Sequence, residues 1–192
     1  MVEPAIRVKI AKAFINTVRV TEPNLLKQLV YKTASDTADL KTYAIQVVEN
    51  DWLPLWRQKH FNDSMLQVIG FPAFRLLWRQ TMLRLVDGPT LKPLFDGAIT
   101  LFGRTPQALT KIVPRIWSLA LRDVGQVKLE NSVSSNQACL KLENVPIAVD
   151  DGFIEGVAGC FEAFYDLCDA DGKVEIASQK ASTHQIVYLL NW

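Results

Sequence analysis

The stretch from Asp150 to Lys173 constrains the fold most, because one helical pattern there is flanked on both sides by strand-like runs. Asp150 and Asp151 suit the start of a helix, since a carboxylate there accepts from unpaired backbone N–H groups at the positive end of the helix dipole. The run DADG at 169–172 is typical of a turn. We therefore predict a helix over residues 151–168.

Two rows of side chains run along this predicted helix. Apolar residues recur at spacings of three and four, which places them on one face: Phe153, Val157, Phe161, Phe164 and Cys168. Glycines form a second row: Gly152, Gly156 and Gly159. Each interior glycine costs a helix roughly 1 kcal/mol relative to alanine, so the row indicates a close approach to a neighbour. Tight packing on a sheet is one explanation, and a ligand-facing surface is the alternative.

The segments around the helix alternate between apolar and polar residues. Residues 124–130 and 138–144 predict one antiparallel hairpin, and residues 174–177 and 185–190 predict a second. The fold class expected is α+β. A helical N-terminal part precedes an antiparallel sheet in the order strand, strand, helix, strand, strand, with the helix across one face of the sheet.

The first part of the chain carries helical patterns at residues 5–19, 25–30, 40–48 and 71–86, although residues 6–10 also alternate as a strand would. Trp52 and Trp56 flank a proline, which predicts a short helix or turn that places both rings in a groove. Pro114 is expected to end or kink the helix that starts at Thr105 and Pro106. We expect a helical region at 1–70 and an α+β domain at 71–192, or one continuous domain.

Charge is unevenly distributed along the chain. Residues 1–122 hold 17 Lys and Arg against nine Asp and Glu, whereas residues 123–192 hold four against eleven. The two halves could complement each other within the molecule or between subunits. The alternative is a basic surface that meets an acidic partner. No zinc-finger spacing or basic-aromatic RNA motif is present, so nucleic acid is not expected as a partner.

Composition indicates a globular protein. Of the 192 residues, 49% are hydrophobic and 21% are charged. No apolar run approaches the roughly 20 residues that cross a bilayer, and the N-terminus lacks the pattern of a secretory signal. Three cysteines without paired spacing favour reduced thiols, so a cytoplasmic location is expected.

The sequence carries no recognisable catalytic motif. Only His60 and His184 are present, and neither a Gly-x-Ser-x-Gly elbow nor a phosphate-binding loop occurs. A zinc site needs about four ligands, yet Cys160 and Cys168 lie roughly 12 Å apart along one helix. We therefore expect no enzyme, no metal site and no cofactor.

Three segments resemble a known superfamily: Arg104–Glu130, Asp151–Phe164 and the closing run HQIVYLLNW. They look like the 4-vinyl-reductase and haem-NO-binding-associated domains, whose wider fold includes TRAPP subunits. The likeness is closest to the myxobacterial paralogous family of uncharacterised proteins. The resemblance implies either small-molecule binding or a dimeric scaffold. The haem-binding relatives carry a Tyr-x-Ser-x-Arg motif that this sequence lacks, and His184 precedes Gln185 where relatives tend to have His-Cys.

Two functions follow as hypotheses. The first is a non-enzymatic, homodimeric adaptor in bacterial signalling that binds a protein partner through Trp52, Trp56, Arg75 and Arg79. The alternative is a sensory domain that binds a small hydrophobic ligand between helix 151–168 and the sheet. Its expected lining residues are Trp117, Cys139, Phe153, Gly156 and Phe161.

Overall fold

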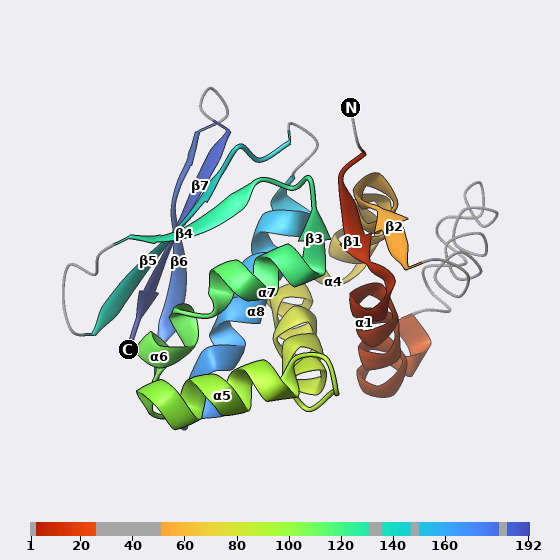
Figure 1. Cartoon of the computed structure of the whole chain (residues 1–192). Helices are drawn as coiled ribbons and strands as arrows, with labels where there is room; N and C mark the ends of the chain where they lie inside the picture. The colour runs from red at the N-terminus through yellow and green to blue at the C-terminus, as the bar shows by residue number, and fades with distance from the viewer. Residues whose placement is uncertain (1–2, 26–50, 131–135, 147–149, 181–183) are drawn as a thin grey trace.

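Helices make up most of the described residues before Gln126, and the described residues after it form a sheet with one long helix across one face (Figure 1). The computed structural model describes residues 3–25, 51–130, 136–146, 150–180 and 184–192. Residues 26–50, which hold most of the predicted second helix and all of the predicted third, lie outside this description. The elements before the main sheet are β1 (Ala5–Arg7), α1 (Val8–Thr21), β2 (Trp52–Pro54), α4 (Leu55–Val86), α5 (Lys92–Phe102), α6 (Pro106–Thr110), α7 (Val113–Ala120) and β3 (Leu121–Arg122).

The predicted α+β class is confirmed by the second half of the chain. Its elements are β4 (Gln126–Glu130), β5 (Gln137–Glu143), α8 (Asp151–Cys168), β6 (Lys173–Lys180) and β7 (Gln185–Asn191). The strands form two antiparallel hairpins joined through β5 and β7, in the order β4-β5-β7-β6. Helix α8 lies across one face of this sheet, where the Tyr188 hydroxyl donates to the Ile154 carbonyl at 3.1 Å.

A second, three-stranded sheet ties the N-terminus to the middle of the chain. Its order is β2-β1-β3, with Ile6 opposite both Leu53 and Leu121. The helix expected over residues 5–19 therefore begins only at Val8, and the strand left open as the alternative is present at residues 5–7. The predicted turn around Pro54 is wrong: Trp52–Pro54 is an edge strand, where a missing N–H is tolerated.

Proline and glycine set the breaks between helices. Gly70 adopts φ +73° and interrupts α4, and Pro72 lies in the first turn of its second half, which matches the helix predicted at 71–86. Pro114 lies in the first turn of α7, so the predicted break is confirmed. Thr105 starts α6, where its hydroxyl accepts from the Ala108 N–H at 3.2 Å.

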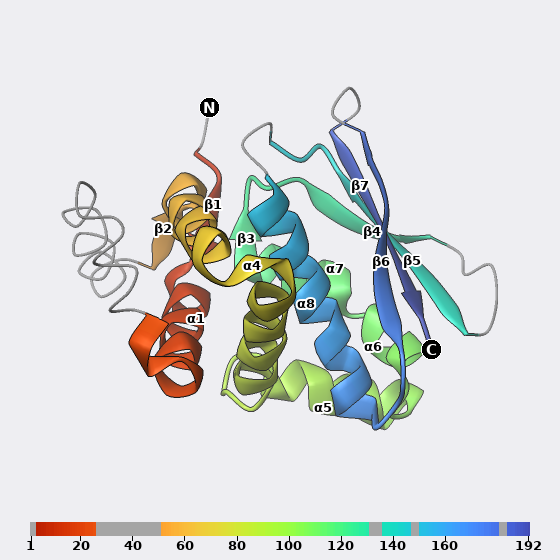
Figure 2. The same cartoon turned by 180° about the vertical axis from the view of Figure 1, so that it is seen from behind.

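Helix α8 lies beside α4 (Figure 2), and its glycine row is at their contact. A Cβ on Gly159 would lie 2.3 Å from the Arg75 carbonyl oxygen, and one on Gly156 would lie 3.0 Å from Trp78 Nε1. The expectation that these glycines contact the sheet is therefore wrong. The sheet contacts other side chains of α8, such as Phe161, whose ring centroid is 5.3 Å from that of Tyr188.

Ion pairs between α4 and α8 join the basic and acidic halves of the chain. Lys59 Nζ lies 2.6 Å from Asp150 Oδ2. Arg75 contacts Glu155 at 2.8 Å and Glu162 at 3.0 Å. Arg79 forms a bidentate pair with Asp166. Part of the charge asymmetry seen in the sequence is thus complementarity within the molecule.

Candidate functional site

A cavity of about 670 Å³ lies between α1, α4, α7 and α8. Residues of β1, β3, the 88–91 loop and Asp51 complete its lining, and the four-stranded sheet contributes none. This volume falls within the range of roughly 300–1,000 Å³ that is usual for small-molecule sites. The cavity is the strongest candidate site in the described part of the chain.

The pocket predicted between helix 151–168 and the sheet is in the wrong place. Leu140, Tyr188 and Leu190 on the inner face of the sheet are fully buried against the core. The cavity instead lies along the face of α8 that meets α4 and α7. Side chains from the sheet fill one side of α8, whereas the α1 and α7 side leaves space unfilled.

Aromatic rings form much of the cavity wall. The Trp78 ring stacks on Phe14 with centroids 4.3 Å apart. Trp117 meets Phe153 edge-on at 6.0 Å, which joins α7 to α8. Phe161 and Met82 add further apolar surface. Such a wall binds apolar molecules through burial of their surface and offers few polar anchors.

A tight turn after β3 positions Trp117. Its indole N–H donates to the Gly125 carbonyl oxygen at 3.2 Å. Gly125 has φ +75°, and a Cβ there would lie 2.3 Å from the Glu143 carbonyl oxygen. Only glycine fits this turn, so the backbone of the turn helps orient an aromatic residue of the cavity.

Few polar groups lie in the inner wall. Gln58 Nε2 donates to Asn62 Oδ1 at 2.9 Å, and both side chains are buried. The buried Trp78 Nε1–H has no hydrogen-bond partner among the described residues. Burial raises the pKa of the Cys160 thiol to about 12. This thiol therefore stays protonated near neutral pH and is a poor nucleophile.

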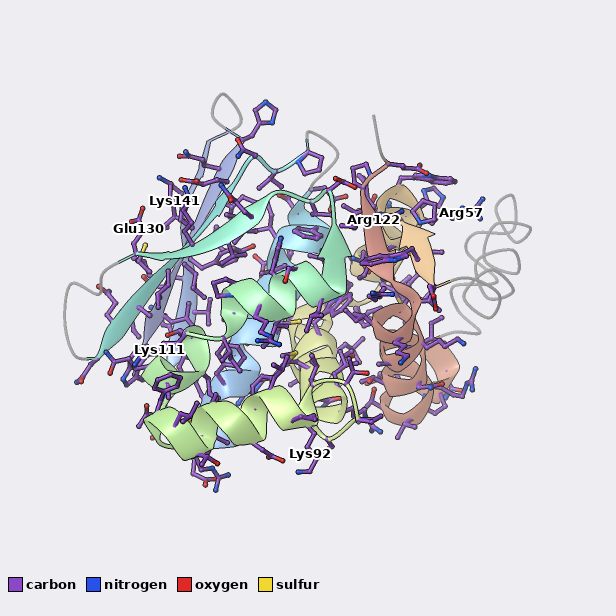
Figure 3. The ribbon with its side chains drawn as sticks, viewed as in Figure 1. Arg57, Lys92, Lys111, Arg122, Glu130 and Lys141 are labelled. Carbon is purple, nitrogen blue, oxygen red and sulfur yellow. The ribbon has the colours of Figure 1, made fainter. Side chains whose placement is uncertain are left out.

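Four of the five predicted ligand-binding residues line the cavity, namely Trp117, Phe153, Gly156 and Phe161. Cys139 does not line it. Its Sγ lies on β5, 3.6 Å from Glu130 Oε2, beside the Glu130–Lys141 pair labelled in Figure 3. Burial, followed by the Glu130 carboxylate, raises the pKa of the Cys139 thiol. Ligand binding by the four lining residues stays a prediction.

The sequence did not single out the contribution of α4 to this site. Trp78, Met82 and the Gln58–Asn62 pair all line the cavity. The spacing of four between Gln58 and Asn62 puts them on one helix face. Nothing in the local pattern says that this face borders a cavity, because that depends on how α4 packs against α1 and α8.

The four residues predicted to bind a partner make contacts within the molecule. The guanidinium groups of Arg7 and Arg122 lie 4.1 and 5.0 Å from the Trp52 ring centroid; Arg122 is labelled in Figure 3. Trp56 is 48% exposed, and its indole N–H donates to Glu3 at 2.9 Å. Arg75 and Arg79 are held by carboxylates of α8. The two arginines thus stabilise the α4–α8 contact.

Comparison with protein-family models and with curated proteins gives no match. Solved structures do match. A structure from a study of haem distortion in the H-NOX (haem nitric oxide/oxygen binding) family aligns with a TM-score of 0.63 at 12% identity, covering 97% of this chain and 95% of that one. The fold is that of an H-NOX domain.

Two other H-NOX structures agree with this fold. An oxygen-binding H-NOX domain related to soluble guanylate cyclases gives a TM-score of 0.61 at 12% identity, covering 97% of this chain and 94% of that one. A mutant Fe(II) unliganded H-NOX protein from K. algicida gives 0.63 at 8% identity, covering 97% and 96%. The resemblance to the 4-vinyl-reductase and TRAPP-like superfamily, including its myxobacterial branch, is therefore wrong. The emphasis on protein–protein interaction in the predicted adaptor function is overturned as well.

The residues of the cavity do not fit a haem group. Haem iron is held by His, Tyr, a Cys thiolate or Met paired with His, yet the described lining contains no His and no Tyr. Its sulfur atoms belong to Met82, which has no His to pair with in the described lining, and to Cys160, whose Sγ lies 4.0 Å from the Trp78 carbonyl oxygen. His60 and His184 do not line the cavity, and His184 Nδ1 lies 3.0 Å from the Val145 carbonyl oxygen instead.

Proposed function

We propose that this chain is a non-enzymatic sensory domain that binds a small hydrophobic ligand in the cavity between α1, α4, α7 and α8. The cavity of about 670 Å³ is the observation that supports this most directly. The fold supports it as well, because an H-NOX domain of the same architecture is described as oxygen-binding. A site built from α4 and α8 of an H-NOX fold but without haem ligands suits an organic molecule better than a haem-bound gas.

The chemistry of the lining argues for binding without turnover. General acid–base catalysis needs a group that titrates near the working pH, and the described lining offers no histidine. The Cys160 thiol, with a pKa of about 12, cannot supply a thiolate near neutral pH. A ligand in this cavity would be held by burial of apolar surface and would leave unchanged.

Binding of a neutral apolar fluorophore tests this function. We expect N-phenyl-1-naphthylamine to bind at one site per chain with micromolar affinity, and Trp78 and Trp117 to report binding through their emission. Val157 lines the cavity from α8, so Val157→Phe fills part of the space. This variant should weaken binding by about tenfold while lowering stability little, because overpacking is harmful only where no space exists.

A matched control is Ala177→Phe, which adds a phenyl ring at an exposed position on β6, away from the cavity. It should bind the fluorophore as the native chain does. Absence of saturable binding by the native chain, or equal binding by all three proteins, contradicts the proposed function. Titration calorimetry provides the affinity and stoichiometry without relying on fluorescence.

The mismatch with haem leads to a separate expectation. Purified protein mixed with hemin should show only the broad absorption of weakly associated hemin, and gel filtration should remove it, because the described lining offers no His or Tyr ligand. The measurement is the absorption spectrum before and after filtration. A sharp Soret band that survives filtration and is lost in Met82→Leu would show that this interpretation of the donor set is wrong.

A further inference from the structure

The mouth of the cavity is basic, in contrast to its apolar interior. Lys9 and Lys12 of α1 and Arg84 of α4 line the cavity with exposed side chains. Asp51 is the one acidic residue of the described lining. The charged groups therefore lie where the cavity meets solvent, and cations outnumber carboxylates there.

These three cations differ from the basic residues that face α8. Lys59, Arg75 and Arg79 are each paired with acidic side chains within the molecule. Lys9, Lys12 and Arg84 form no ion pair or hydrogen bond through their side chains with any described residue. Arg7 also lines the cavity but is engaged, since its Nε–H donates to the Leu119 carbonyl oxygen at 3.3 Å and its guanidinium lies over Trp52.

We propose that the ligand of this cavity is an amphipathic organic anion, such as a fatty carboxylate. Its apolar body would lie among the aromatic residues, and its head group would lie beside Lys9, Lys12 and Arg84. This inference rests on the proposed function of the cavity and adds the ligand's chemical class.

Two physical reasons support the assignment of charge. An ionised head group buried without a partner carries a large desolvation cost, so it belongs at the solvent-exposed mouth. There, cations that have no ion-pair partner among the described residues attract an anion without first breaking such pairs. A guanidinium such as that of Arg84 can also hold a carboxylate through two parallel hydrogen bonds. A cationic amphiphile would meet like charges at the same place.

The test compares three ligands with one chain length and different head groups: dodecanoate, dodecan-1-ol and dodecyltrimethylammonium. Each is used below its micelle concentration with the full chain, and affinity is measured by displacement of N-phenyl-1-naphthylamine. The expected order is anion, then neutral alcohol, then cation. The advantage of the anion should shrink at about 0.5 M salt, because exposed charges are screened within a few ångströms there.

The triple variant Lys9→Gln, Lys12→Gln, Arg84→Gln should weaken dodecanoate by about tenfold, as expected for three partly exposed ion pairs, and leave dodecan-1-ol unchanged. The control variant Arg19→Gln, Lys92→Gln, Arg115→Gln removes the same charge from exposed positions outside the cavity. It should leave both affinities nearly unchanged. Asp51→Asn removes the acid at the mouth and should tighten dodecanoate, a gain that damage to the fold cannot produce.

The outcomes separate this inference from the proposed function. Equal affinity for dodecanoate and dodecan-1-ol, or equal losses in the two triple variants, overturns the anionic class while the cavity remains a ligand site. Failure of all apolar probes to bind overturns the proposed function and this inference with it. Selective loss of dodecanoate in the cavity variant, together with the gain in Asp51→Asn, supports both.

Discussion

At the scale of single residues, glycines decide how closely α4 and α8 approach. Gly159 lies so near α4 that a Cβ would sit 2.3 Å from the Arg75 carbonyl oxygen. Gly97, inside α5, has no atom within 4 Å of the same position. The two glycines share a helical conformation and differ in their surroundings. They therefore form a matched pair for testing how closely α4 and α8 pack at the glycine row, a contact called here the α4–α8 seam.

We expect Gly159→Ala to lower the free energy of unfolding by about 2–3 kcal/mol, because the backbone atoms it meets cannot move aside without separating the helices. Gly97→Ala should raise the same free energy by about 0.5–1 kcal/mol, since alanine restricts the unfolded chain more than glycine does. Urea denaturation followed by circular dichroism measures both. Two changes of the same sign would contradict the assignment of Gly159 to a backbone contact.

The sequence indicated that the glycine row approaches something closely but could not identify the partner. Spacing along a helix reports which residues share a face. The choice between sheet, ligand and helix α4 depends on contacts between residues more than 80 positions apart, such as Arg75 and Gly159. Trp78 was missed as a cavity residue for the same reason, because its place follows from three helices packing together.

At the scale of elements, α8 is held at its N-terminus by two interactions of one carboxylate. Asp150 accepts from the Phe153 N–H at 3.0 Å and pairs with Lys59 at 2.6 Å. Burial opposes ionisation of this carboxyl, but the hydrogen bonds from Lys59, Asp63 and Phe153 prevail and lower its pKa. The charged form of Asp150 is therefore favoured by folding.

Asp150→Asn keeps a side chain that can cap a helix but removes the ion pair with Lys59. We expect it to reduce the free energy of unfolding by about 1 kcal/mol near pH 7. Because the folded pKa lies below the unfolded value of about 3.9, this stabilisation is present above that value and is lost as pH falls through the folded pKa. The difference between variant and native protein should therefore disappear in strong acid.

Thermal unfolding at a series of pH values measures this difference. Asp150→Ala serves as the comparison, since it removes the cap as well and should stay less stable than the native chain at every pH. A deficit in Asp150→Asn that persists unchanged into strong acid would contradict a role for the ionised carboxylate.

Most of these elements were predictable from local patterns. The α8 start follows from Asp150, and both hairpins follow from alternation of apolar and polar residues. The short strand β1 was only one of two alternatives, because it has three residues and its apolar spacing fits a helix as well as a strand. The β2 strand contains Pro54, which argues against a strand until its edge position in the sheet is known.

At the scale of the whole molecule, the fold matches H-NOX structures while the cavity chemistry departs from haem binding. Architecture and site chemistry can diverge in this way, because a fold supports many unrelated sites. The sequence lacks the Tyr-x-Ser-x-Arg motif of haem-binding relatives. The resemblance drawn from its small and apolar residues nevertheless pointed to the wrong superfamily. Patterns of small and apolar residues define packing, and related packing occurs in several α+β folds.

No helix in the described residues is both long and apolar enough to span a membrane.

The seam between α4 and α8 also shapes how the cavity could respond to an occupant. At Gly156, which lines the cavity, and at Gly159 beside it, α8 carries no side chain that could change rotamer, and its backbone packs directly on α4. We therefore expect a guest larger than the resting volume to displace α1 or α7 before it separates α8 from α4. Both helices adjoin the small β2-β1-β3 sheet, as α1 follows β1 and α7 leads into β3. Such a displacement would be passed to the β2-β1-β3 sheet, because that sheet is continuous with both helices.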